Sequence, residues 1–439
     1  MELSSYTFVI VASAIVILSY FYNIISKKTN IPSVLLLIIT GFGIKQAITY
    51  MGAEELDLFP ILEVLGIVGL IMIVLEAALD LELKREKAPI LYKALLIAFL
   101  GLVASAGIIG YIIQFFLDVE FGIALLYALP LSIISSAIVI PSITALGEHK
   151  KEFMIYESTF SDILGIMFFY FLISGLEAEH TSELIWEISW NIVATVVISL
   201  LVSYMLVYIF QNIRTKIKLF LLIAVLILLY AIGKQLHLSS LLIILVFGLI
   251  LNNQKVFFKG VLDRWLKPEA IKSILTDFQL VTVETAFIVR TFFFVIFGAT
   301  ITIESLFNVE VFIISTLILA GIYISRVIII KAVERKDIDP QIYIAPRGLI
   351  TILLFFNIPS NLQIPEFDSG ILLYVILSTS LIMTWSLIKG GSKKGMYDDM
   401  LFDDEVAGSS AEVDATEKSS KSGSEGENPS SAQATRPYP

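Results

Sequence analysis

Two carboxylates and two serine hydroxyls lie within six residues of an otherwise apolar part of the chain. They belong to Glu157, Ser158, Ser161 and Asp162, and the apolar run from 163 to 176 follows directly. With its polar start, the segment is long enough to cross a bilayer. Ionisable groups inside a membrane are costly and usually mark an ion or proton pathway. The cluster therefore predicts an intramembrane site for a cation or a proton.

Helical spacing divides this cluster into two parts. Ser158 and Asp162 are four residues apart and share one helix face, as do Glu157 and Ser161. At about 100° per residue, Glu157 and Asp162 point roughly 140° apart. Asp162 with Ser158, and Ser161 at the margin, offers hard oxygen ligands for a small monovalent cation such as Na⁺ or K⁺. The alternative is that Asp162 is merely solvated near a cytoplasmic helix end.

A single arginine stands in a segment that proline and glycine should break. Arg347 lies between Pro346 and Gly348, and the backbone carbonyls that such a break frees can accept from its guanidinium. A buried arginine also needs an anion, and Glu157 is the natural candidate. We therefore expect a structural ion pair between Glu157 and Arg347. Asp162 is then the one uncompensated acid, able to hold either a proton or a cation.

Other charges fall inside apolar segments. Glu76, Glu284 and Arg290 are possible accessory residues, and Arg290 could pair with Glu76 or Glu284 in a structural role. Asp80 and Arg326 lie near expected cytoplasmic ends, so we interpret them as markers of topology.

The composition indicates the elements that must position these residues. The chain has 439 residues, of which 57% are hydrophobic and 16% are charged, whereas soluble domains have about 25% charged residues. This excess of apolar residues predicts an all-α polytopic membrane protein. On a ruler of about 20 residues per crossing, we expect thirteen segments: 6–25, 31–50, 60–81, 89–117, 121–146, 157–176, 185–210, 218–234, 237–252, 274–299, 308–330, 340–358 and 370–389.

Charge between the segments predicts the topology. Basic and acidic connections alternate along the chain, which places the N-terminus outside and the C-terminus in the cytoplasm by the positive-inside rule. Residues 397–439 are rich in acidic residues, Ser and Gly, and we expect them to form a disordered cytoplasmic tail. We expect residues 1–396 to form the transmembrane domain. The net charge of −10 and the absence of cysteine give no indication of a nucleic-acid partner and exclude cysteine-based metal sites.

Two segments carry interruptions that a plain membrane helix would lack. They are residues 132–142 in the fifth segment and 345–351 in the twelfth. Interruptions at corresponding positions of two halves are typical of transporters built from inverted repeats, whose site lies at mid-membrane. The halves would be segments 1–6 and 8–13. Gly41 and Gly43 are interpreted as helix-packing positions.

These motifs together resemble the monovalent cation:proton antiporters of the NhaP and NHE branch. Glu157 to Asp162 is similar to their E-S-x-x-N-D signature. Residues 290–295 are similar to R-T-F-F-F, residues 346–349 to the R-G segment, and residues 74–79 to the acidic motif of the third helix. The resemblance implies crossed broken helices, an ion-carrying core (89–176 and 308–389) and a dimerisation region (6–81 and 185–299). It also implies a homodimer in the lipid bilayer of a bacterial plasma membrane.

The same resemblance implies roles for individual residues. Asp162 would bind cation or proton in alternation, Ser158 would lend an oxygen, and Glu76 would reach the site through water. The transported ions would be H⁺ and Na⁺, Li⁺ or K⁺, and neither a cofactor nor enzymatic activity is expected. Catalysis in the chemical sense would be absent, because an ion gradient would supply the driving force.

Two departures from the family pattern bear on ion choice. Ser161 replaces the usual Asn, and the acid of the fifth helix is missing, since Ser135, Ser136, Ala137 and Ile138 stand there. The latter stretch is closer to the S-S-T-A of potassium-exchanging relatives, and Ser136 is a possible accessory ligand. One carboxylate predicts electroneutral exchange, with Na⁺ favoured. The alternatives are a K⁺/H⁺ antiporter and a sensor that no longer transports.

Overall fold

The computed structural model describes most of the chain as helices. The residues described are 5–29, 31–50, 59–83, 85–143, 146–177, 197–209, 211, 218–235, 240–258, 268–300, 308–334 and 338–389. Internal contacts separate Met1–Ile388 from Lys389–Pro439, and the description below concerns the first unit. The expected acidic tail, 397–439, lies outside the described residues.

A helix is found at each of the thirteen expected segments. In chain order they are α1 (Ser5–Thr29), α2 (Ser33–Tyr50), α3 (Phe59–Asp80), α4 (Ala88–Leu117), α5 (Phe121–Ser132) with α6 (Ser136–Ser142), α7 (Glu148–Glu177), the helix Val197–Ile209, α9 (Lys218–Gln235), α10 (Ser240–Asn252), α12 (Pro268–Thr300), α13 (Val309–Val333), η4 (Gln341–Tyr343) with α14 (Leu349–Phe356), and the helix Gly370–Lys389. Short elements η1 (Arg85–Lys87), α11 (Gln254–Phe257) and η5 (Ser360–Leu362) lie between them. No strand occurs in these described residues.

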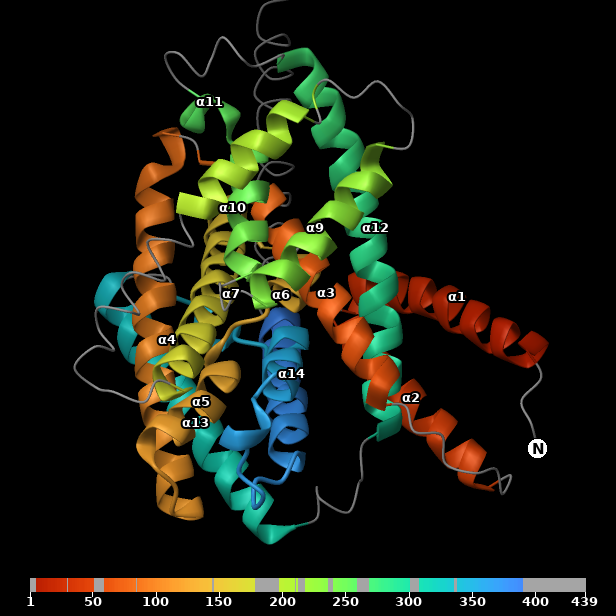
Figure 1. The fold of residues 1–439 in the computed structure, drawn as a ribbon. Coiled ribbons are helices and arrows are strands. Elements are labelled where there is room, and N and C mark those ends of the chain that lie inside the picture. The colour runs from red at the N-terminus through yellow and green to blue at the C-terminus, as the bar shows by residue number, and fades with distance from the viewer. Residues whose placement is uncertain are drawn as a thin grey trace, which may run out of the picture. The chain divides into compact units, whose positions relative to one another are not determined.

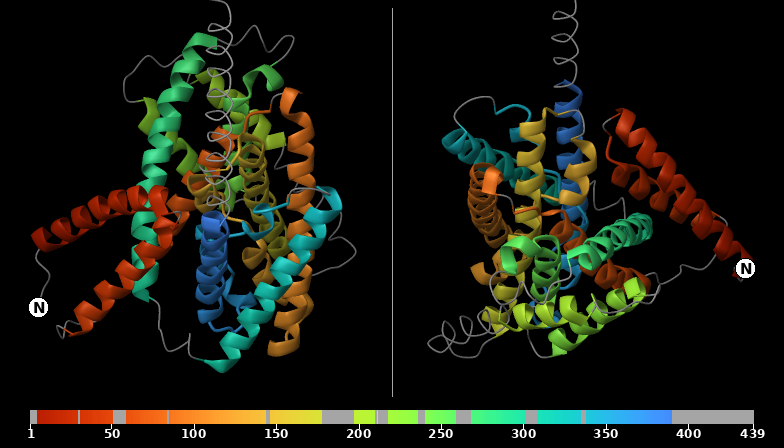
Figure 2. Two further views of the ribbon diagram at one scale, coloured as in Figure 1. Left: turned by 180° about the vertical axis from the view of Figure 1, so that it is seen from behind. Right: turned by 90° about the horizontal axis from the view of Figure 1, so that it is seen from above.

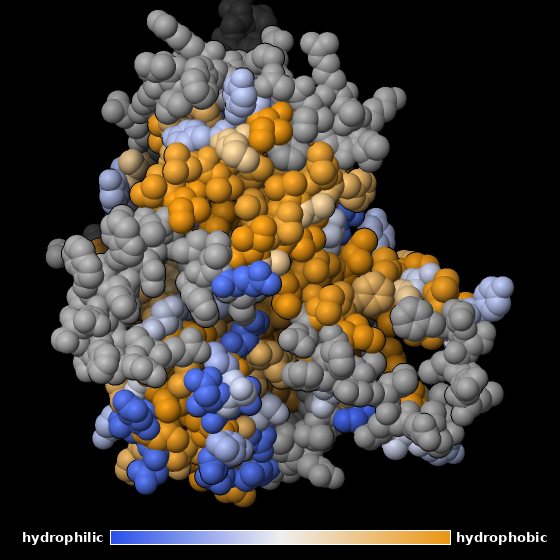
Figure 3. Space-filling model, in the orientation of Figure 1, coloured by the Kyte–Doolittle hydropathy of each residue, from blue (hydrophilic) through white to orange (hydrophobic). Residues whose placement is uncertain are grey.

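The helices are long and apolar enough to cross a bilayer. Eight spans in the described residues meet that criterion by length and composition, and shorter apolar helices accompany them. Figure 3 shows apolar side chains covering most of the middle of one face. Large side chains such as Tyr6, Ile10 and Leu201 are more than half exposed, as expected where lipid replaces water.

Helix packing produces two neighbourhoods within this unit. The helices α4, α5, α7 and α13 pack side by side, while α12 packs against α2 and α3 and α10 packs against α3 (Figures 1 and 2). Gly41 and Gly298 make close approach of α2 and α12 possible: a Cβ on Gly41 would collide with the Val295 carbonyl. Gly43 has open space around it, so the packing expectation is confirmed for Gly41 and wrong for Gly43.

Both expected interruptions are breaks in helices. The chain is extended at residues 133–135, between α5 and α6, and again at 344–348, before α14. The two breaks meet, because the Ser135 N–H donates to the Pro346 carbonyl at 2.9 Å. Gly348 is required at this crossing since a Cβ there would collide with the Ser135 side chain. The crossing of two broken helices thus forms the centre of the fold.

Candidate functional site

The polar cluster lies on α7 where that helix passes the crossing. Glu157, Ser158, Ser161 and Asp162 are all at most 2% exposed. The broken helices leave backbone N–H and C=O groups without helical partners. These groups are available to bond the four side chains of the cluster. The four side chains nevertheless make different contacts.

Asp162 faces the start of α6. One carboxylate oxygen, Oδ2, accepts from the Ser136 N–H at 3.1 Å. The other oxygen, Oδ1, is buried and has no hydrogen-bond partner in the described part of the chain. A buried carboxylate oxygen without a partner is costly unless a proton or a cation satisfies it.

A small space adjoins this carboxylate. It is about 10 Å³ in volume, close to the minimum for one water molecule. Apart from Asp162 itself, its walls are apolar: Ile73, Val74 and Ala77 from α3, Leu241, Leu242 and Leu245 from α10, Ile163, Ile166 and Met167 from α7, and Ile350 from α14. Asp162 is therefore enclosed between α7 and the helices α3 and α10 in this structure.

The two serines of the cluster bond to backbone groups. Ser161 Oγ accepts from the Ile134 N–H at 2.9 Å, inside the first break. Ser158 Oγ donates to the Met154 carbonyl at 2.8 Å on its own helix, which leaves its lone pairs free to accept or to coordinate. In the described residues, no hydrogen bond joins either hydroxyl to Asp162. Ser161 thus supports the break in α5–α6 in this structure.

The partner of Glu157 differs from the expected one. Arg326 on α13 donates to both Glu157 oxygens, at 2.6 and 3.1 Å, and both side chains are almost fully buried. Arg326 also donates twice to the Gln341 carbonyl in η4. The expected Glu157–Arg347 pair is therefore wrong, and so is the interpretation of Arg326 as a marker of topology. The pair ties α7, α13 and η4 together beside the crossing.

Arg347 is satisfied by backbone carbonyls. Its guanidinium donates to Leu131, Ser132 and Ala345, and the first two carbonyls are at the C-terminal end of α5, where no helical N–H is left to bond them. The Arg347 N–H donates to the Thr379 hydroxyl. Arg347 thus links the two broken helices. The prediction that freed backbone carbonyls accept from its guanidinium is confirmed.

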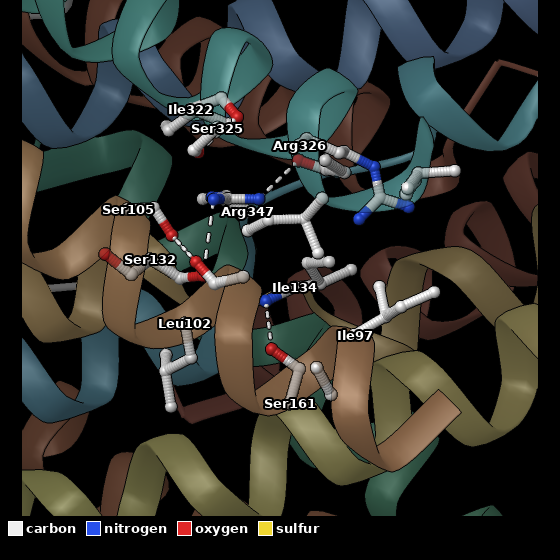
Figure 4. Close-up of a pocket in the computed structure, with 15 residues that line it drawn as sticks. Ile97, Leu102, Ser105, Ser132, Ile134, Ser161, Ile322, Ser325, Arg326 and Arg347 are labelled. Atoms are coloured by element: carbon white, nitrogen blue, oxygen red, sulfur yellow. Dashed lines mark hydrogen bonds between the residues drawn. The ribbon is translucent and has the colours of Figure 1, made fainter. Parts of the chain in front are cut away.

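A second cavity lies beside Arg347. It is about 20 Å³ in volume, and its polar lining consists of Arg326, Arg347 and the serines Ser105, Ser132, Ser161 and Ser325. Figure 4 shows Arg347 reaching across it toward Ser132, and Ser161 turned toward Ile134. The space suffices for a water molecule.

The remaining accessory residues divide between α3 and α12. Arg290 Nη2 lies 3.3 Å from Glu76 Oε2, which confirms the first of its two expected partners. The Glu284 side chain is exposed and forms none of the ion pairs found in the described residues. No group of three or more His, Asp or Glu that could hold a metal occurs among the residues described.

Two functional contacts were missed at the sequence level. Arg326 stands in the apolar run 311–330, and its depth in that run was the available signal. Thr379, which receives the Arg347 N–H, is one of several hydroxyl residues in the last segment, and nothing in the sequence distinguishes it from the others.

Comparison with known proteins identifies the family of the chain. The model of the family described as "Sodium/hydrogen exchanger, transmembrane" matches residues 11–389. The chain belongs to the sodium/hydrogen exchanger family. It is therefore a multi-pass integral membrane transporter that exchanges cations for protons and not an enzyme.

Solved structures show the same fold as this exchanger. The sodium proton antiporter MjNhaP1 from Methanocaldococcus jannaschii at pH 8 has a TM-score of 0.64 at 19% identity, over 88% of this chain and 97% of that one. A structure of MjNhaP1 from electron microscopy has a TM-score of 0.63 at 19% identity, over 90% and 97%. No curated protein sequence matches the chain.

Proposed function

We propose that this exchanger carries a monovalent cation, with Na⁺ favoured, in one direction and H⁺ in the other by binding them alternately at Asp162. The observation that carries the proposal is the buried Oδ1 of Asp162, which has no partner among the described residues. A proton or a dehydrated cation would satisfy the same oxygen, so the two compete. Ser158, one helical turn before Asp162, and Ser136, whose N–H donates to this carboxylate, are the candidates for further oxygen ligands.

The charges around the crossing support electroneutral exchange. Glu157 is neutralised by Arg326, and the Arg347 charge is spread over three carbonyls. Asp162 then remains as the one acid at the crossing whose charge changes in the cycle. One carboxylate that exchanges one proton for one monovalent cation moves no net charge.

Alternating access supplies the movement in this proposal. Asp162 lies between the expected ion-carrying core, 89–176 with 308–389, and the expected dimerisation region, 6–81 with 185–299. Movement of the core would expose the carboxylate first to one side and then to the other. The alternation of charged connections favours an outside N-terminus and a cytoplasmic C-terminus, and the exposed apolar face of α1 is available for a homodimer or for lipid.

A K⁺/H⁺ antiporter with the same mechanism is the second candidate. It is favoured by the stretch Ser135 to Ile138, which carries hydroxyls and no acid. A transport-inactive sensor is a candidate of another class, motivated by the same missing acid. It predicts no proton flux with any alkali cation.

The test is proton flux in proteoliposomes that contain a pH-sensitive dye, with Na⁺, K⁺ and Li⁺ added in turn. We expect cation-dependent flux in the wild type and none in Asp162→Asn, with both proteins eluting as monodisperse species. Flux that persists in Asp162→Asn contradicts the assignment. Flux that depends strongly on membrane potential contradicts electroneutrality.

A further inference from the structure

Arg290 connects three elements that meet beside Asp162. It lies on α12, and its side chain is 17% exposed. Nη2 approaches Glu76 on α3 at 3.3 Å, and Nη1 donates to the Ala137 carbonyl on α6 at 3.4 Å. The third nitrogen, Nε, is buried without a partner in the described residues. Both contacts are long for charged hydrogen bonds, so the guanidinium is shared between two acceptors.

The Ala137 carbonyl that Arg290 bonds lies next to the residue that bonds Asp162. Ala137 is the second residue of α6, directly after Ser136, whose N–H donates to the Asp162 carboxylate. The group that binds Asp162 and the group that binds Arg290 thus belong to consecutive residues. Any displacement of the start of α6 relative to α12 must change the Arg290 contact.

The surroundings of this contact are apolar. Around Asp162, the α3 and α10 side of the interface consists of Ile73, Val74, Ala77 and three leucines. Apolar surfaces are attracted without directional preference, so they set no particular register between the two sides. Arg290 therefore supplies a directional bond where the ion-binding residues meet α3 and α12.

We propose that Arg290 is a positioning residue that latches α6 to α3 through Glu76, and that the latch must open for Asp162 to change sides. In the state shown, the Ala137 carbonyl and the Glu76 carboxylate share the guanidinium. When the core moves, the carbonyl leaves and Glu76 retains the charge, so that no uncompensated arginine remains beside the ion path. This inference rests on the proposed alternating access at Asp162.

The natural absence of cysteine in the chain permits a direct test. A single reporter, Leu245→Cys on α10, lines the space next to Asp162 and is buried in the latched state. Its rate of reaction with a membrane-permeant maleimide in proteoliposomes measures how often the two sides separate. Loss of one charged hydrogen bond in Arg290→Gln should raise that rate roughly tenfold.

A matched control uses the adjacent residue. Thr291 on α12 bonds to Ser19 on α1 at 2.7 Å, within the dimerisation region, so Thr291→Val should leave the labelling rate unchanged. Arg290→Lys keeps the charge but loses the planar guanidinium that bonds two acceptors. We expect a smaller increase in the labelling rate than for Arg290→Gln. If Arg290→Gln fails to fold, Arg290→Lys carries the test alone.

Three outcomes separate the latch from the proposed function. An unchanged labelling rate in the folded Arg290 variants overturns the latch, even if cation exchange by the wild type stands. An equal increase in Thr291→Val also overturns it, because general loosening of α12 would then explain the result. If the wild type shows no exchange but only the Arg290 variants label faster, the latch is supported and the proposed function fails.

Discussion

The two buried arginines allow a decisive test of which one neutralises Glu157. The structure gives Arg326 two charged hydrogen bonds to Glu157 and gives Arg347 none. Removing one member of a buried pair costs about 3–5 kcal/mol because the other charge is left unpaired. We therefore expect Arg326→Met and Glu157→Gln each to lower stability by about 3 kcal/mol or more.

The double variant decides the matter. With both charges gone, Glu157→Gln with Arg326→Met should cost less than the sum of the single changes by about 2 kcal/mol, within the range that contacting residues show. Arg347→Met should also be costly, since the Leu131, Ser132 and Ala345 carbonyls would lose their donors. Combined with Glu157→Gln, however, it should be additive to within about 1 kcal/mol.

Thermal unfolding in detergent, followed by the fraction that remains monodisperse, measures these differences. Membrane proteins often unfold irreversibly, so all variants are compared at one heating rate. Additive effects of Glu157→Gln and Arg326→Met would refute the assigned pair. Strong coupling between positions 157 and 347 would restore the pair expected from the sequence.

Three further predictions follow from local contacts. Gly41→Ala should destabilise the protein by about 1–3 kcal/mol, because the added Cβ collides with α12. Gly43 has open space around it, so Gly43→Ala should be neutral or stabilising by up to about 1 kcal/mol. Equal melting temperatures of the two variants would contradict this. Ser161→Ala removes the acceptor of the buried Ile134 N–H and should cost about 1–3 kcal/mol, with Ser161→Asn less harmful; a neutral Ser161→Ala would show that the break needs no such support. Outside the membrane, the hydrogen bond to Glu152 raises the pKa of Lys87 above its ordinary 10.5. This partly exposed pair contributes below about 1 kcal/mol of stability at neutral pH, and the contribution is lost as the pH rises through the raised pKa. The stability difference between wild type and Lys87→Met should therefore be constant from pH 6 to pH 9 and vanish only in strong alkali.

Helix positions were readable from the sequence because lipid imposes a length and a composition on each crossing. The break at 344–348 was readable because Pro346 and Gly348 interrupt a helix, and the break at 133–135 was marked by the serines Ser132, Ser135 and Ser136 in an apolar run. Asp162 could also be singled out, because a carboxylate in an apolar run is costly wherever the run packs. These signals are local and need no knowledge of the neighbours.

The pairing of charges could not be read in this way. Arg326 and Arg347 are both compatible with a distant Glu157, and only the packing of α13 against α4 places Arg326 within reach. Arg347 lies close to the C-terminal end of α5, and its guanidinium donates to backbone carbonyls there instead of to Glu157. Similarly, Ser161 shares the helix with Asp162, but its contact with Ile134 depends on where the break in the neighbouring helix falls.

The arrangement of these charges also bears on why the carrier would not cross empty. In the proposed cycle, an ionised Asp162 without cation or proton must pass Ile73, Val74 and Leu245, which offer no polar partner. Burying an unpaired carboxylate among such residues is strongly unfavourable, whereas the protonated or cation-bound form carries no net charge. Arg347 cannot compensate the empty form during this passage, because its donors are held by the carbonyls of the broken helices. Coupling of the two ion flows then follows from the apolar lining itself, and replacing Val74 with Asn should allow uncoupled proton leak that is measurable without any added cation.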